Sequence, residues 1–131
     1  MPNTYEITRS IDIEDAVRSA LSEKFDVYCR PLPAKFKLPS LLVQTVGGVE
    51  NNTIDNVDIS LDARAKDEGS AYELLRNAIA FLKVIAKEQT TPIRHVSVNA
   101  SGSWGSDPVR PDLALCTARL TVTVHQEKTT I

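Results

Sequence analysis

The sequence is short of the residues that build reactive or membrane-embedded sites. It has two cysteines, two histidines and one tryptophan in 131 residues, and aromatic residues make up 5% of the chain. No apolar run approaches the roughly eighteen residues that cross a bilayer, so a membrane-spanning helix is not expected. Residues 1–9 lack the basic start and apolar stretch of a secretion signal, so we expect assembly inside the cell.

Strong net charge is also missing. The formal net charge is −2, with 24% charged and 42% hydrophobic residues. A chain with this balance has no general attraction to phosphate, so specific DNA binding is not expected. The length and the hydrophobic fraction are typical of one globular domain, and we draw it over residues 1–131.

The two cysteines, Cys29 and Cys116, each lie in an apolar, strand-like stretch. A free thiol in such a setting behaves as a small buried hydrophobe. We therefore predict two buried thiols, with a disulfide between them as the alternative.

Apolar residues at spacings of three and four predict two helices, over Ser10–Lys24 and Asp67–Glu88. The first helix could be capped by Ser10 or by Asp12. The second could be capped by Asp67, or by Ser70 with Glu73 three residues later as a capping box.

Alternating apolar and polar residues predict the strands. The clearest is Asn56–Lys66, with the odd positions apolar and the even positions polar. Gly47-Gly48 is expected to stop an earlier strand before a polar turn over Glu50–Thr53. The full set is Phe25–Arg30, Ser40–Val46, Asn56–Lys66, Ile93–Ser101 and Leu113–His125. The prediction is an α+β fold, a mostly antiparallel sheet of about five strands with two helices on one face, in the order α-β-β-β-α-β-β.

No constellation of reactive residues follows from the pattern. His95 and His125 lie on predicted strands, away from other metal-ligand residues at a suitable spacing. Asp58 and Asp62 share one strand face but are roughly 13 Å apart, further than paired glycosidase carboxylates. We therefore expect no catalytic, cofactor or metal site, and a protein that is not an enzyme.

Two segments are candidates for protein contact. The loop Ser101–Asp112 holds the only tryptophan, Trp104, which would either fold back over the core or anchor a partner. Arg110 could pair with an acid across such an interface. The second segment is a proline-rich arm, Arg30–Pro39, although a plain crossover loop is the alternative. The candidate interface residues are Trp104, Asp107, Arg110, Phe36, Leu38 and Pro39.

Nearly the whole chain resembles the tail terminator, or tail completion, family of long-tailed bacteriophages. The likeness lies in the early helix, the proline arm running into Pro39–Gln44 and Gly47-Gly48, the alternating strand Asn56–Ala65, Asp67 opening the long helix, the Trp104–Pro108 loop and the closing strand from Arg119. It is a pattern without an invariant motif.

The resemblance implies a virion protein at the junction of tail and neck, assembled in the host cytoplasm. Its subunits would form a ring, commonly a hexamer, that caps the tail tube, stops its polymerisation and meets the head-side connector. DNA would pass through the hole without specific binding, past Asp58 and Asp62 as lumen-facing acids. A head-completion or neck adaptor is the close alternative, and a small intracellular binding module or an enzyme of unknown class are alternatives of other kinds.

Overall fold

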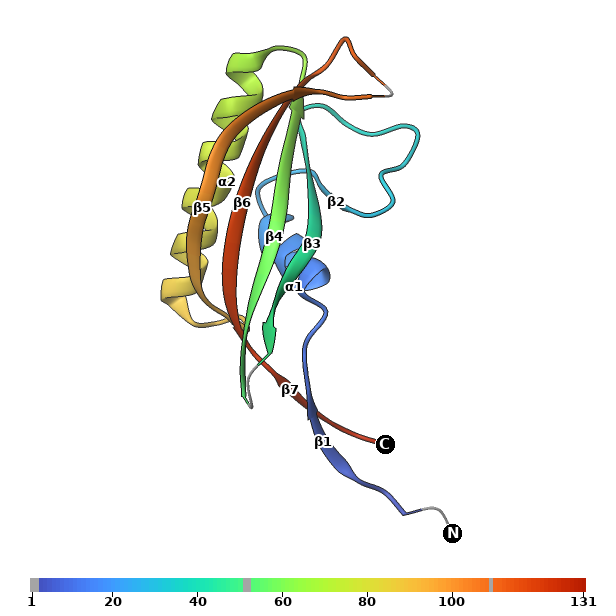
Figure 1. Ribbon diagram of the computed structural model, residues 1–131, viewed down its shortest axis with the longest axis vertical. Coiled ribbons are helices and arrows are strands. Elements are labelled where there is room, and N and C mark those ends of the chain that lie inside the picture. Colours follow the sequence, from blue (N-terminus) through green and yellow to red (C-terminus); the bar gives the residue numbers. More distant parts are fainter. Residues whose placement is uncertain (1–2, 51–52, 109) are drawn as a thin grey trace.

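The computed structural model describes residues 3–50, 53–108 and 110–131, and within them it has two helices and seven strands (Figure 1). In chain order the elements are β1 (Glu6–Arg9), α1 (Ile13–Leu21), β2 (Val27–Cys29), β3 (Ser40–Glu50), β4 (Ile54–Ala65), α2 (Glu68–Glu88), β5 (Ile93–Ser106), β6 (Ala114–His125) and β7 (Glu127–Thr130).

Five of the strands form a twisted sheet in the order β2-β3-β4-β6-β5. All its pairs are antiparallel except the short pairing of β2 with β3. Both helices cover the same face, with α1 over β2 and β3 and α2 over β4, β6 and β5 (Figure 1). The predicted α+β class, with two helices and a mostly antiparallel sheet, is confirmed.

The helices begin where side-chain caps replace the missing backbone acceptors. Asp12 accepts a hydrogen bond from the Asp15 amide at 3.2 Å, and Asp67 accepts one from the Ser70 amide at 2.8 Å. Of the two caps predicted for each helix, Asp12 therefore caps α1 and Asp67 caps α2.

One hydrophobic core lies between the helices and the sheet. Its fully buried members come from every element of the sheet except β2 and from both helices, and include Val17, Leu21, Val43, Leu61, Leu82, Leu120 and Val122. The odd positions of β4 point into this core, as the alternation predicts.

The predicted strand count and order are wrong. The described residues form seven strands in the order β-α-β-β-β-α-β-β-β, because β1 and β7 pair with each other in a separate two-stranded ribbon. Each ribbon strand has four residues, mostly polar, so neither produces an alternating hydrophobic signal. The parallel pairing of β2 with β3 is the exception within the mostly antiparallel sheet that the sequence predicts.

The prediction that Gly47 and Gly48 end their strand is wrong. They lie inside β3, at an irregularity in its pairing with β4. A side chain at Gly48 would place its Cβ 2.6 Å from the Asn56 carbonyl oxygen, and its φ of 146° is one that residues other than glycine rarely adopt. The glycines thus let β3 stay close to β4. Asn51 and Asn52, in the predicted turn, lie outside the described residues.

The predicted loop from Ser101 is shorter than expected, because β5 continues to Ser106 and pairs with β6 through Trp104 and Gly105. Trp104 therefore belongs to a strand rather than to a loop. The residues from Asp107 to Leu113 make the connection to β6, with Val109 outside the described residues.

Both cysteines are free thiols, with Cys116 buried in the core and Cys29 only half-buried. Burial raises the pKa of each thiol, and for Cys29 the neighbouring Glu14 carboxylate adds to the effect. Among the described residues no helix is long and apolar enough to span a membrane.

Candidate functional site

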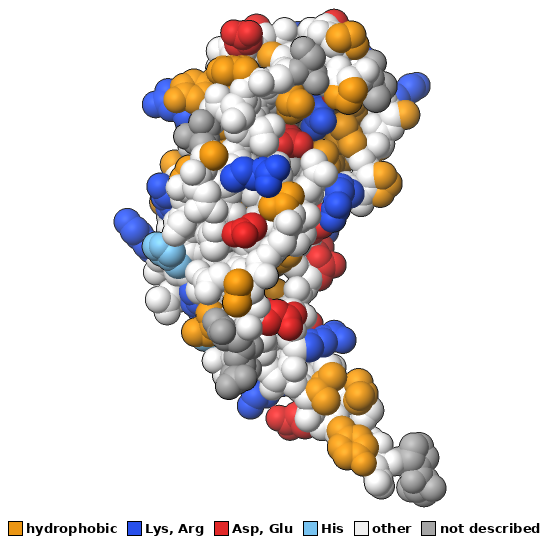
Figure 2. Space-filling view, in the orientation of Figure 1, with side chains coloured by type: hydrophobic (Ala, Val, Ile, Leu, Met, Phe, Trp, Pro, Cys, Tyr) orange, Lys and Arg blue, Asp and Glu red, His pale blue; other side chains and the backbone are white. Residues whose placement is uncertain are grey.

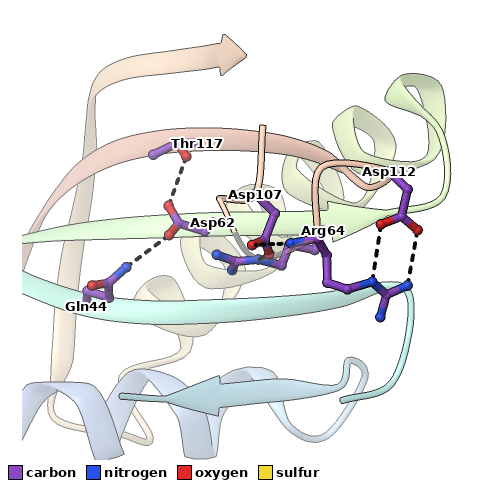
Figure 3. Close-up of polar contacts among 7 residues, drawn as sticks. Gln44, Asp62, Arg64, Asp107, Asp112 and Thr117 are labelled. Carbon is purple, nitrogen blue, oxygen red and sulfur yellow. Dashed lines mark hydrogen bonds and ion pairs between the residues drawn. The ribbon is translucent and has the colours of Figure 1, made fainter. Parts of the chain in front are cut away.

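The sheet face opposite the helices carries a network of polar side chains centred on Asp62 in β4. Its carboxylate accepts hydrogen bonds from Gln44 of β3 at 3.0 Å and from Thr117 of β6 at 2.9 Å, as Figure 3 shows. Ser60 donates a third at 3.0 Å. Three strands are thereby joined side chain to side chain, in addition to their backbone ladders.

Next along β4, Arg64 reaches the connection between β5 and β6. Its Nε donates to Asp107 Oδ2 at 2.7 Å, and both side chains are at least nine-tenths buried (Figure 3). Asp107 also accepts from the Arg110 amide at 3.1 Å. This ion pair fixes the β5–β6 connection over the sheet.

These contacts change what two of the candidate residues can do. Asp62 has 7% of its surface exposed and Asp107 has 4%, so both are structural groups in the single chain and not free contact groups. Asp62 is therefore shielded from solvent in the single chain, and its position facing a lumen stays a prediction. Alternation shows which side of a strand a residue takes, but not what covers that side.

The other end of the polar face is more open. Asp58 is half-buried and accepts a hydrogen bond at 2.7 Å from Thr121, which in turn accepts one from Asn99 at 2.6 Å. Thr123 makes the equivalent bond to Asn56 at 2.7 Å. The face is thus lined mostly by hydroxyl and amide groups, with Arg119 exposed among them.

An aromatic cluster borders the β5 edge of the sheet. The rings of Trp104 and Tyr72 lie 6.1 Å apart, and the Arg76 guanidinium lies 5.5 Å from the centre of the Tyr72 ring. Trp104 is 48% exposed and Tyr72 43%, and Val98 on the same strand is also exposed. Trp104 is therefore only partly covered by its own chain, and it sits on an edge strand whose outer side has no neighbour in the sheet.

Arg110, the other charged residue of this region, is exposed and already has a partner. Its guanidinium donates two hydrogen bonds to the Asp112 carboxylate, at 3.2 and 3.1 Å (Figure 3). This pairing raises the pKa of Arg110 and lowers that of Asp112. A partner acid would have to compete with Asp112.

The proline arm has no helix or strand between Arg30 and Pro39, as predicted. The Tyr28 hydroxyl accepts from the Lys37 amide at 3.1 Å, which holds the arm near β2. Phe36 and Leu38 are half-buried and Pro39 is exposed. The arm therefore keeps exposed apolar side chains in the single chain, among them Pro31, Pro33 and Pro39.

Glu14 connects the start of the arm to the first helix. Its carboxylate accepts from Arg30 at 2.9 Å and from the Thr45 amide, beside the irregularity of β3, at 3.2 Å. Burial acts to raise the pKa of Glu14, but these hydrogen bonds outweigh it and lower the pKa below its ordinary value.

The β1–β7 ribbon extends away from the main sheet at the end opposite the β5–β6 connection (Figure 1). Tyr5 and Ile131, at its tip, are 60% and 69% exposed. Figure 2 shows hydrophobic side chains gathered there. This surface has only a weak signal in the sequence, namely the isolated Tyr5 and Ile131.

In the part of the chain that the structure describes, no three histidine, cysteine or acidic side chains lie close enough together to hold a metal ion. His95 and His125 are both exposed on strands. Compared with models of known protein families and with curated proteins, the chain matches none.

Proposed function

We propose that the protein is a structural component of a phage tail, a subunit that assembles into a ring, caps the tail tube and joins it to the head-side connector. The observation that carries the proposal is the presence of two unlike surfaces on opposite sides of one subunit. One is the β5 edge with Trp104 and Tyr72, and the other is the side with α1 and the projecting ribbon (Figure 1).

A head-to-tail ring requires two different patches on each subunit, because each copy offers one patch to the preceding copy and the other to the next. The long open edge of β5 offers unpaired backbone groups, and the aromatic pair offers apolar area beside them. The ribbon provides a separate exposed apolar tip, formed by Tyr5 and Ile131, for a neighbouring subunit or for the tube.

The polar face of the sheet is our candidate for the wall of the central hole. Its hydroxyl and amide side chains around Asp58 pair with one another, which leaves few free donors for phosphate. In this proposal DNA slides past the face without being held. The exposed Arg119 lies on this face and would attract it.

The test uses the purified protein and the tail-tube protein of the phage that carries it. Tubes polymerised with the protein should be shorter, with rings at their ends, when measured by electron microscopy. Tubes of unchanged length with bare ends would defeat the proposal. Deleting the gene separates the two neck roles, since loss of a terminator gives overlong tails and loss of an adaptor gives tails of normal length without heads.

A further inference from the structure

Two grooves of opposite charge flank the last turns of α2. The basic groove lies between α2 and β5 and is lined by Lys83, Lys87, Arg94 and His95, with no acidic residue in its lining, in a volume of about 530 Å³. Within the described residues none of its three full cations makes an ion pair, and Arg94 Nη1 is buried without a hydrogen-bond partner. In Figure 2 blue side chains follow this margin, on the left of the view.

The acidic groove lies on the other side of α2, against α1. None of the described residues that line it is a lysine or an arginine, and its volume is about 630 Å³. The acidic residues in its wall are Asp12, Asp15, Glu23, Glu88 and Glu127. Apolar side chains, among them Ile11 and Ile85, form part of the same lining. Arg18 and Arg9 pair with Asp15 and Glu127, and Asp12 caps α1. Glu23 and Glu88 are exposed and make no ion pair among the described residues, so their charges are available to a neighbouring copy.

We propose that the basic groove of one copy docks on the acidic groove of the next copy, so that this contact joins the subunits of the ring. The charges are complementary, which favours the head-to-tail pairing over head-to-head and tail-to-tail pairings. The exposed Tyr72, Val98 and Trp104 lie along the same margin as the basic groove and add apolar area to the contact.

The position of the grooves favours closure. Both border the C-terminal part of α2, since Lys83, Lys87, Ile85 and Glu88 all lie within its last two turns. Patches at the same level along the helix can be brought together by rotation about an axis parallel to it, with little translation along that axis. Such a contact closes into a ring instead of winding into a filament.

This inference rests on the self-assembly part of the proposed function and not on the tail. The experiment uses two double variants of the full chain, and each variant reverses two exposed charges of one groove. Lys83→Glu with Lys87→Glu makes the basic groove more negative by four charge units, and Glu23→Lys with Glu88→Lys makes the acidic groove more positive by four. All four side chains are exposed, so the fold should be kept, as a circular dichroism spectrum and a melting curve can check.

Each variant alone should dissociate about tenfold or more readily than the wild type in native mass spectrometry and sedimentation at low salt, because the two reversed side chains then face like charges of the next copy. A one-to-one mixture should assemble again into rings of alternating variants, since the reversed lysines of one variant then face the reversed glutamates of the other. The matched control is Lys66→Glu with Arg119→Glu, two exposed positions that line neither groove, which changes the net charge equally and should assemble as the wild type does.

Any of three results would contradict the proposed contact between the two grooves. They are variants that assemble as the wild type does, a mixture of the two variants that stays dissociated, and a wild type that remains monomeric at every concentration. A short DNA duplex that binds the wild type and not the Lys83, Lys87 variant, while assembly is unaffected, would assign the basic groove to nucleic acid instead. If rings form through this contact but tube length is unchanged, the proposed tail function is contradicted and the proposed contact between subunits is supported.

Discussion

The two faces of the main sheet are buried by different means. On the helix side, β4 and β6 present fully buried apolar residues such as Ile59, Leu61 and Leu120. On the other side, Asp62 and Arg64 of the same β4 are almost as buried, but each is held by hydrogen bonds or an ion pair. The first face is stabilised by area removed from water and tolerates substitutions of similar volume. The second depends on the pairing of its buried charges, with Arg64 Nη1 left as a buried donor without a hydrogen-bond partner. Losing one partner should therefore cost more than losing the pair.

Among variants that test the two faces, Asp107→Ala should have the largest effect on stability. It leaves the buried Arg64 charge without its partner and should lower the free energy of unfolding by about 3–5 kcal/mol, measured by urea denaturation. The double variant Arg64→Met, Asp107→Leu should recover most of that loss. Arg110→Ala removes an exposed charge from the same connection and is the control. If Asp107→Ala were no worse than Arg110→Ala, the buried pair would not hold this connection.

On the apolar face, Leu61→Ala should destabilise the protein by about 2–5 kcal/mol, since it removes buried methyl groups and leaves a cavity in the core. Leu61→Met keeps the volume and should cost less than about 1.5 kcal/mol. Val49→Ala, on an exposed part of β3, is the control and should have almost no effect. Equal losses for the alanine and methionine variants would argue against tight packing here.

Asp62→Ala should cost about 1–3 kcal/mol, because Gln44, Ser60 and Thr117 would each lose an acceptor. Asp62→Asn keeps the shape and part of the acceptor capacity, so it should fall between alanine and the wild type. Thr121→Val tests the more open end of the same face and should cost less. The order of the three variants in a thermal melt is the measurement, and a reversed order would contradict the greater burial of Asp62.

Trp104→Ala tests the β5 edge, which belongs to neither buried face. Because nearly half of the side chain is exposed, the stability of the single chain should fall by only about 1 kcal/mol. Self-association should weaken much more, as sedimentation at several concentrations can measure. Normal assembly combined with a large loss of melting temperature would place the indole in the core instead.

The smallest expected effect is the pH dependence from Glu14. Its folded pKa lies below the ordinary value of 4.5, so its contribution to stability is present above that pH and is lost as the pH falls through the folded pKa. Glu14→Gln should therefore differ in stability from the wild type at pH 6 and approach it at pH 3. Glu68→Gln, at the exposed start of α2, is the control, and a stability difference for Glu14→Gln that is independent of pH would contradict the assignment.

The two faces of β4 illustrate what the alternation of apolar and polar residues can predict. The alternation of Asn56–Lys66 placed Leu61 in the core and Asp62 on the opposite face, and both placements are right. It could not show that Asp62 and Arg64 are buried, because their cover comes from residues distant in the sequence, such as Gln44, Asp107 and Thr117.

Other errors arose where a local signal has two structural meanings. Paired glycines usually mark a turn, but Gly47 and Gly48 serve an irregularity within β3. The glycine- and serine-rich stretch around Trp104 resembled a loop and is an edge strand whose pairing with β6 shifts register three times. Of the six candidate interface residues, Trp104 alone combines an exposed aromatic ring with an open sheet edge.

The reciprocal backbone hydrogen bonds between Tyr5 and Ile131, at 2.8 and 2.9 Å, have a consequence for the order in which the molecule forms. They close a loop that runs from residue 5 to residue 131, and the entropy of closing so long a loop is recovered only after the intervening chain has folded. The ribbon should therefore be the last element to form and the first to open in amide hydrogen exchange. A circular permutant can test this order: a short peptide joins Ile131 to Tyr5, and the new termini lie in the proline arm. It should keep the same main sheet and helices, and its ribbon should form early in folding.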